Sequence, residues 1–324
     1  MLTIFQAGGQ VGKHLTEGLL KNGKHTVTAI SRPGSTNKLP EGVRVARVDY
    51  SGDEDSALVE ALRGQDALII TMAVTAPPGT INKLSRAANK AGVPYVLPNW
   101  MGHDDRNRKF TDESMIGPMR DSILAEFANM TGTSYIFLVC NFWYEFSLGG
   151  GPDRYGFDFK KRTFIQFDEG TEYIDTTTWP QCGRALASVL SLKVLPDDEN
   201  DKSPTLSQFA NDSVCVSSFR VNQLDMFESV KRVTGTTDSD WTITKESAVK
   251  RWEDGQAEMK KGNFMGGFPK QLYSRMFFPG NGDGDLRKTR QMHNEMLGLP
   301  VEDLDEYTGI AVQMGLNDAV VSSH

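Results

Sequence analysis

The chain has 324 residues, of which 24% are charged and 39% hydrophobic, and its formal net charge is −7. This composition is typical of folded globular proteins and excludes a chain that is disordered throughout. The acidic excess disfavours nucleic acid or an anionic membrane as the main partner. The first residues form no signal peptide, no apolar run reaches about 18 residues, and the three cysteines suggest no disulfide framework, so we expect a cytoplasmic protein.

The first 140 residues alternate between short apolar runs and segments with helical periodicity. Strands are predicted over residues 2–5, 25–30, 43–49, 67–70, 94–97 and 135–139. Helices are predicted between them, and the clearest repeat is Val11, Leu15 and Leu19, closed by Gly23. The other helices are predicted over 53–62, 79–90 and 112–130. This alternation predicts an α/β fold built on a Rossmann-type doubly wound parallel sheet.

Beyond Cys140 the pattern changes and strands become sparse. Strands are predicted over 163–167 and 214–217, and helices over 178–192, 222–234, 245–261, 284–296 and 301–313. We expect this second half to be a smaller α+β portion that lies against the ligand-binding edge of the sheet.

The turn after the first strand contains the residues Gly9, Gln10, Val11 and Gly12. Free N–H groups and the positive dipole end at the start of a helix bind phosphate, and glycine lets the phosphate approach the backbone. Gly9 and Gly12 have the spacing of a dinucleotide fingerprint, but Gln6 stands where its first glycine is expected. The alternative is a plain turn in which the glycines serve only packing.

Ser31 and Arg32 follow the second strand, at the position that selects the dinucleotide. An acidic residue there would bind the ribose 2′-hydroxyl of NAD, whereas a guanidinium binds the 2′-phosphate of NADP with two parallel hydrogen bonds. No Asp or Glu lies between Gly23 and Pro40. The predicted cofactor is therefore NADP(H), and the alternative for Arg32 is a solvated loop arginine.

Further candidate residues follow the other strands, because ligands bind at the carboxyl ends of such strands. Asp49 and Tyr50 follow the third strand, where Asp49 either accepts a hydrogen bond from adenine or caps the strand end. The remaining predicted cofactor contacts are Thr71, Met72, Ala73, Pro98 and Asn99. The predicted substrate contacts are Trp100, Phe142 and Trp143, whose rings suit a flat ligand. Core packing between the two halves is an equally good interpretation of Phe142 and Trp143.

Five blocks of sequence together resemble the NmrA-like branch of the atypical short-chain dehydrogenase/reductases, and in particular the fungal isoflavone-reductase-like proteins. The blocks are Ala7–Gly12, Ser31–Pro33, Val93–Pro98, Phe142–Glu145 and Thr178–Arg184. The resemblance implies an NADP-binding Rossmann domain over residues 1–145. It also implies a smaller substrate-binding portion over 146–324, with some segments returning to pack on the Rossmann sheet.

The resemblance also exposes a missing catalytic group. Relatives of isoflavone reductase carry a catalytic lysine four residues before an arginine, and alignment on Arg120 puts Ile116 at that position. The chain has no Tyr-x-x-x-Lys pair either. If the protein is an enzyme, its proton donor must therefore come from another loop, and the candidates are Tyr144 first and His103 second.

Two functions remain open from the sequence. The first is a reductase that transfers hydride from NADPH to a small metabolite, of aromatic or conjugated character. The second is a non-catalytic, NADP(H)-sensing regulatory protein, because some NmrA-like relatives bind NADP without catalysis. The five histidines are scattered, so no metal site is predicted.

Overall fold

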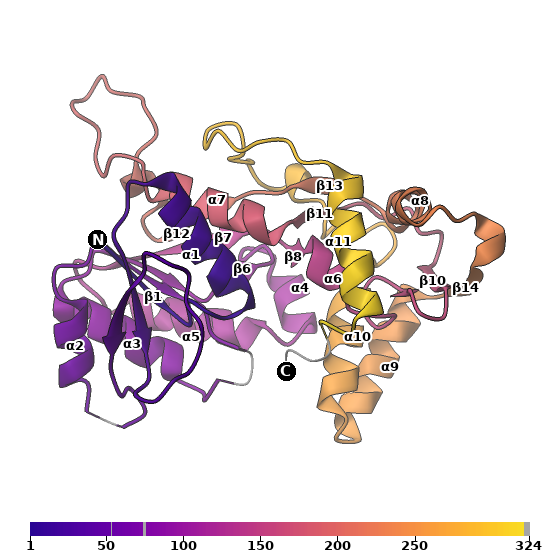
Figure 1. The fold of residues 1–324 in the computed structure, drawn as a ribbon, viewed down its shortest axis with the longest axis horizontal. Coiled ribbons are helices and arrows are strands. Elements are labelled where there is room, and N and C mark those ends of the chain that lie inside the picture. The colour runs from indigo at the N-terminus through magenta and orange to yellow at the C-terminus, as the bar shows by residue number, and fades with distance from the viewer. Residues whose placement is uncertain (53, 74–75, 321–324) are drawn as a thin grey trace.

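The computed structural model describes residues 1–52, 54–73 and 76–320 (Figure 1). Its centre is an eight-stranded sheet in the order β12-β7-β5-β4-β1-β2-β3, with β6 beside β7. All neighbours in this sheet pair in parallel. The strands are β1 (Leu2–Phe5), β2 (Val27–Ser31), β3 (Arg44–Arg47), β4 (Ala67–Ile70), β5 (Tyr95–Pro98), β6 (Met101–Gly102), β7 (Ser134–Val139) and β12 (Asp212–Cys215).

Helices cover both faces of this sheet, which confirms the predicted doubly wound Rossmann-type fold. One face packs against α1 (Gln10–Asn22) and α7 (Trp179–Val189). The other face packs against α2 (Ser56–Leu62), α3 (Thr80–Ala91) and α5 (Gly117–Phe127). Because both faces are covered, a central strand such as β4 is buried along its whole length and reads as an apolar run.

The second half of the chain contributes to the Rossmann layer itself. The edge strand β12 pairs with β7, and α7 packs along α1. A Cβ at Gly18 would overlap the backbone of Gly183, so the two helices approach each other through glycines. The division at residue 145 therefore remains a proposal about domains, since the sheet draws one strand and one covering helix from beyond it.

The remaining elements form an aromatic-rich α+β portion. Two three-stranded sheets have the orders β14-β10-β9 and β13-β11-β8. Their strands are β8 (Phe142–Trp143), β9 (Phe157–Asp158), β10 (Thr163–Phe167), β11 (Ile174–Thr177), β13 (Phe219–Val221) and β14 (Thr242–Glu246). The helices are α4 (Arg108–Glu113), α6 (Tyr144–Leu148), α8 (Gln223–Thr234), α9 (Ala248–Lys260), α10 (Phe264–Met276) and α11 (Leu304–Leu316). No helix among the described residues is long and apolar enough to span a bilayer.

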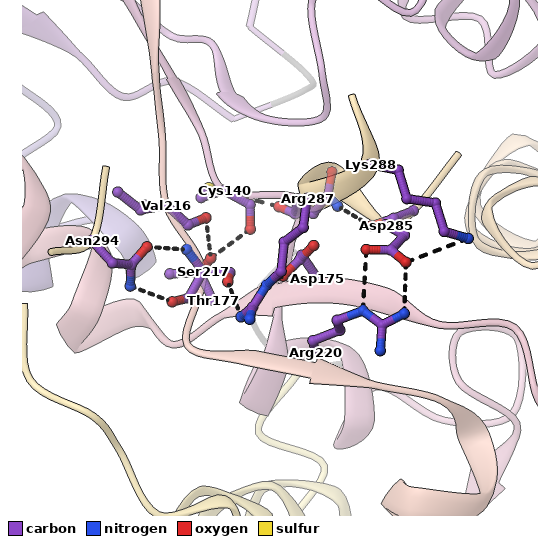
Figure 2. A network of polar contacts seen from close by, with 12 residues as sticks. Cys140, Asp175, Thr177, Val216, Ser217, Arg220, Asp285, Arg287, Lys288 and Asn294 are labelled. Carbon is purple, nitrogen blue, oxygen red and sulfur yellow. Dashed lines mark hydrogen bonds and ion pairs between the residues drawn. The ribbon is translucent and has the colours of Figure 1, made fainter. Parts of the chain in front are cut away.

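The helix predicted over 284–296 is wrong, because this segment contains only a 3₁₀ turn at Leu286–Lys288. Its side chains bind a neighbouring strand end instead (Figure 2). Asn294 accepts a hydrogen bond from the Ser217 N–H at 3.1 Å and donates one to the Ser217 carbonyl at 2.7 Å. These contacts between distant residues compete with helix formation, and no local pattern reveals them.

Two further differences concern helix boundaries. The helix predicted over 112–130 is split, and α5 begins only at Gly117, after Met115 has adopted a left-handed φ of 62°. The helix predicted over 53–62 begins at Ser56, and residue 53 lies outside the described residues. Residues within two or three positions of a helix end are the least certain part of any prediction from sequence.

The sequence pattern did not predict α10, which contains two glycines and Pro269. Glycine and proline normally break helices. Here a Cβ at Gly267 would overlap the carbonyl of Gly255 on α9, so the glycine allows the two helices to pack closely. Tertiary packing therefore outweighs the low helix propensity of this segment.

Candidate functional site

The turn between β1 and α1 keeps the backbone of a dinucleotide-binding loop despite Gln6. Gln6 has a φ of 54°, which lies in the left-handed region that favours glycine. Its carbonyl accepts a hydrogen bond from the Gly9 N–H at 2.8 Å. Gln6 thus takes the conformation of the missing glycine, at a strain of about 1–2 kcal/mol.

Gly12 cannot carry a side chain at its position. A Cβ there would overlap the Gln6 carbonyl oxygen and lie 2.9 Å from Thr71 Oγ1. Thr71 donates its hydroxyl to the Phe5 carbonyl at 2.6 Å, which ties the end of β4 to the end of β1. Thr71 therefore holds the glycine turn in place, rather than offering its hydroxyl proton to a ligand.

The N-terminus of α1 fits a phosphate group. Gly9 is its N-cap and supplies no capping side chain, and the first turn has no acidic residue. The backbone N–H groups that begin a helix have no partner within it, so those at Gln10, Val11 and Gly12 are left to bind an anion. The absence of a competing carboxylate leaves the positive end of the helix dipole unopposed.

The end of β2 carries two guanidinium groups, of which the sequence identified only one. The Arg32 side chain is exposed, and its guanidinium forms no hydrogen bond or ion pair with the described residues. Arg47 is the register partner of Ser31 across β2 and β3. Its Nη1 donates to Ser31 Oγ at 3.2 Å and to the carbonyls of Arg32 and Ser35 at 3.2 and 3.1 Å. The pairing of parallel strands β2 and β3 would have indicated Arg47, because their carboxyl ends share one edge.

Asp49 and Tyr50 form the next part of this edge. Asp49 is exposed, and its Oδ1 accepts hydrogen bonds from the Ser51 N–H and hydroxyl at 2.9 and 2.6 Å. These bonds hold the pKa of the Asp49 carboxyl below its usual value. The Tyr50 ring stands edge-on to Phe5 at 5.2 Å, and Lys83 donates to the Tyr50 carbonyl at 2.8 Å. The loop is therefore anchored, while Asp49 Oδ2 stays available as an acceptor.

The Asn99 side chain forms hydrogen bonds with the neighbouring loop. It has a φ of 60°, accepts from the Met72 N–H at 2.7 Å and donates to the Met72 carbonyl at 3.2 Å. Pro98 is buried in β5, and Ala73 is exposed beside Met72. Asn99 thus fixes two strand-end loops relative to each other.

Tyr144 does not lie open at the sheet edge, as its proposed role as proton donor requires. Its side chain is fully buried, and its hydroxyl shares a 2.6 Å hydrogen bond with Thr308 Oγ1 on α11. The ring packs edge-on against Phe219. Burial raises the pKa of Tyr144 well above its usual value. This geometry favours a structural role for Tyr144, because its hydroxyl is enclosed and already has a partner inside the protein.

His103 is also enclosed. Its ring stands edge-on between Phe110 at 4.9 Å and Phe142 at 4.5 Å, and its Nδ1 is buried without a hydrogen-bond partner among the described residues. Burial lowers the pKa of His103 to about 4, against a smaller opposing effect of Asn141. The imidazole is therefore neutral at pH 7, so it lacks the proton that an imidazolium would donate as a general acid.

The three predicted substrate contacts separate into different environments. Trp100 packs with Phe137 in the core under α5, and its indole N–H donates to the His103 carbonyl at 2.9 Å. Phe142 stacks on Tyr273 at 3.9 Å in the core of the second half. Trp143 alone stays half-buried. Trp100 and Phe142 therefore pack in cores, whereas Trp143 is the least enclosed of the three.

The position of the family lysine holds no substitute acid. Ile116 is the N-cap residue of α5 and packs between the core under the sheet and the core of the second half. Arg120 is buried and donates to Asp121 Oδ1 at 2.9 Å. The aliphatic side chain thus joins two cores at the place where related enzymes are expected to hold a cation.

Glu145 is a buried carboxyl that the sequence interpretation left without a role. It is 3% exposed, and its Oε1 accepts the Trp179 N–H at the start of α7 at 2.9 Å. Its Oε2 has no partner among the described residues. Burial raises the pKa of Glu145 to about 7. The carboxyl therefore stabilises the N-terminus of α7, and it titrates near neutral pH.

Comparison with known proteins agrees with this geometry. Residues 7–130 match a family model described as NAD(P)H-binding, so this part of the chain is an NAD(P)H-binding domain, and the predicted nicotinamide cofactor is confirmed. Among the described residues, no group of His, Cys, Asp or Glu side chains could hold a metal ion. An oxidoreductase of Aspergillus flavus, aprR, is 26% identical over 309 residues, covering 94% of this chain and 95% of its own.

Solved structures extend the likeness to the whole fold, at low identity. Pinoresinol-lariciresinol and phenylcoumaran benzylic ether reductases give a TM-score of 0.72 at 15% identity, covering 95% of this chain and 97% of theirs. Isoflavone reductase gives 0.67 at 18%, covering 95% and 97%. The NADPH-dependent quinone oxidoreductase QOR2 of Escherichia coli, complexed with NADPH, gives 0.64 at 17%, covering 95% and 98%. The chain thus has the isoflavone-reductase-like fold, as its sequence motifs indicated.

Proposed function

We propose that the chain is an NADPH-dependent reductase of small conjugated acceptors such as enones or quinones. The observation that carries the cofactor assignment is the pair of guanidinium groups, Arg32 and Arg47, beside Ser31 at the end of β2. A phosphate with two negative charges would be held between them by charge-assisted hydrogen bonds. This arrangement favours NADP(H) over NAD(H), which has only a hydroxyl at that position.

The rest of the cofactor site follows from the same edge of the sheet. The N–H groups of Gln10, Val11 and Gly12 would bind the pyrophosphate, and Asp49 would accept from the adenine amino group. When bound, NADPH supplies a hydride to the acceptor. Trp143, the half-buried member of the predicted substrate contacts, would pack its indole ring against a flat acceptor beyond the cofactor.

The choice of a conjugated acceptor follows from the enclosed acids. Hydride addition to an isolated ketone leaves a localised alkoxide, which needs a nearby proton donor. Tyr144 is enclosed against Thr308, and Ile116 cannot donate a proton. Addition to an enone or a quinone leaves an anion delocalised over several atoms, which water can protonate. An enzyme without a placed acid is therefore best suited to conjugated acceptors.

The same burial supports a second candidate function, an NADP(H)-sensing protein without catalysis. A sensor needs the phosphate-binding edge but no proton donor. The two predicted donors both pack inside the core of the second half: Tyr144 belongs to it, and His103 contacts its Phe142. The two functions share the cofactor site and differ only in whether an acceptor reacts.

The test is NADPH oxidation with matched acceptors. We expect single-turnover oxidation of 4-deuterated NADPH by an enone, with deuterium recovered in the product. The corresponding saturated ketone should react at least about 10²-fold more slowly, because general acid catalysis typically contributes a rate factor of that size. Preference for the saturated ketone would contradict the proposed acceptor class. Tight NADPH binding without oxidation by any enone or quinone would favour the sensor.

A further inference from the structure

The tip of the α9–α10 hairpin differs in charge from the rest of the molecule. Residues 259–270 contain Lys260, Lys261 and Lys270 but no Asp or Glu, in a chain whose net charge is −7. Figure 1 shows the hairpin in orange at the lower right, projecting from the body with the turn between α9 and α10 at its free end. The positive segment is therefore carried away from the acidic bulk.

The same tip exposes large apolar side chains. Phe264 is 48% exposed and Met265 is 51% exposed, although both begin a helix within a folded protein. The Phe264 ring stacks on Phe268 at 5.2 Å with an interplanar angle of 9°. Phe264 and Met265 therefore keep about half of their surface exposed among the described residues. Exposed apolar side chains rimmed by polar ones are typical of interaction sites.

The tip is rigid enough to present these side chains. Asn263 caps α10 by accepting a hydrogen bond from the Gly266 N–H at 3.2 Å. At the base, Gln271 and Arg275 both bind Glu113 on α4, to its carbonyl and carboxylate respectively, at 2.5 Å. The hairpin is thus anchored at its base, and little order remains to be imposed on its tip.

We propose that this tip docks on anionic lipid bilayers. Phe264 and Met265 enter the interfacial region, and Lys260, Lys261 and Lys270 lie at the level of the negative headgroups. Lys261 also pairs with Glu258 at 3.2 Å, just outside the positive segment. The acidic remainder of the molecule is repelled by the same surface, so the hairpin approaches first. This surface is independent of the proposed reductase function.

Net charge alone leads to the expectation that the protein does not dock on anionic membranes. That expectation ignores the difference in charge between the hairpin tip and the rest of the chain. The formal charge is a sum over the whole chain, whereas attraction to a bilayer acts within about a Debye length, roughly 8–10 Å, of the surface. At a protruding tip only the nearest charges count. There the three lysines outnumber the nearby carboxylate of Glu258, which pairs with Lys261 and accepts a hydrogen bond from Asn263 at 3.3 Å.

The test is co-sedimentation of the full chain with phosphatidylcholine vesicles that contain or lack phosphatidylserine. The test variant is the double substitution Phe264→Ser/Met265→Ser. The matched control is Val194→Ser/Leu195→Ser, an apolar pair that is 53% and 63% exposed and precedes the acidic residues of segment 197–201. We expect phosphatidylserine-dependent binding that weakens with salt, falls at least about tenfold in the test variant and is unchanged in the control.

Three outcomes would overturn the proposal. The first is no binding to phosphatidylserine vesicles at low salt, and the second is equal loss in the test and control variants. The third is a loss of self-association, seen as a lower molar mass in light scattering, without any change in vesicle binding, which would assign the tip to a second copy of the chain. Melting curves of both variants check folding, and we expect them unchanged because the substituted side chains are exposed.

Discussion

The two ends of the sheet's carboxyl edge differ in how their polar groups are used. At the ends of β2 and β3, Arg32 and Asp49 are exposed and keep hydrogen-bonding groups free for a ligand. At the end of β7, Tyr144 and Glu145 are enclosed by segments from the second half of the chain. The β2–β3 end, called the recognition end below, thus offers free polar groups to the proposed cofactor. At the β7 end, called the enclosed end, the candidate chemical groups are part of the core.

The largest effect is expected from filling the glycine turn at the recognition end. Gly12→Val places a branched side chain against the Gln6 carbonyl and Thr71 Oγ1. We expect loss of NADPH binding and a fall in the free energy of unfolding of about 3 kcal/mol. Calorimetric titration and urea denaturation measure both. The control is Gly52→Ala, where an added Cβ meets open space; normal NADPH binding by Gly12→Val would place the cofactor elsewhere.

The enclosed end should reveal itself through pH. Burial raises the folded-state pKa of Glu145 to about 7, above its unfolded value near 4.5. Stability is therefore greatest below about pH 4.5 with respect to this group, and it declines as the pH rises to about 7. Glu145→Gln removes the titration, so we expect it to be more stable than the parent by up to about 3 kcal/mol at pH 8. Urea midpoints of the parent and the variant at pH 5 and pH 8 measure this difference. A variant that gains no stability relative to the parent between pH 5 and pH 8 would contradict burial of an ionised carboxyl.

The recognition end should lose affinity when either guanidinium is removed. We expect Arg32→Ala and Arg47→Ala each to weaken NADPH binding by about 1.5–3 kcal/mol while leaving NADH binding unchanged. Arg44→Ala, at the opposite end of β3, is the matched control. A loss in Arg32→Ala alone would show that Arg47 only supports the loop through its contacts with Ser31 and Ser35.

The smallest effect is expected at Tyr144. Tyr144→Phe removes the hydrogen bond to Thr308, so we expect a fall of about 1 kcal/mol in the free energy of unfolding and no change in the rate of hydride transfer. Thr308→Val should give a similar loss, and the double variant should cost less than the sum. A rate reduced by about 10²-fold in Tyr144→Phe would restore Tyr144 as the proton donor.

The same contrast explains what could be predicted from the sequence. The sheet, the glycine turn and Arg32 follow from local patterns, because apolar runs, turns and strand ends are short-range features. The spacing also placed Gln6 at the position of the first fingerprint glycine, although its left-handed φ does not follow from the residue type. Arg47 required knowledge of strand pairing, since it reaches the Ser31 loop only through the register of β2 and β3.

The fate of the candidate donors could not be predicted locally. Tyr144 meets Thr308, which is 164 residues away in the chain, and Phe142 stacks on Tyr273 from α10. Tyr144 and Phe142 are residue types that are common in binding sites, but both are surrounded by core side chains. Burial by a distant helix decides between these, and neither spacing nor residue type contains that information.

The most direct test of the recognition end is calorimetric titration of the parent protein with NADPH and with NADH under the same salt conditions. A 2′-phosphate held beside Arg32 and Arg47 predicts that NADPH binds at least about tenfold more tightly, a gap that corresponds to about 1.4 kcal/mol. The gap should shrink as salt is added, because both guanidinium groups are exposed. Equal affinity for the two cofactors would contradict the account.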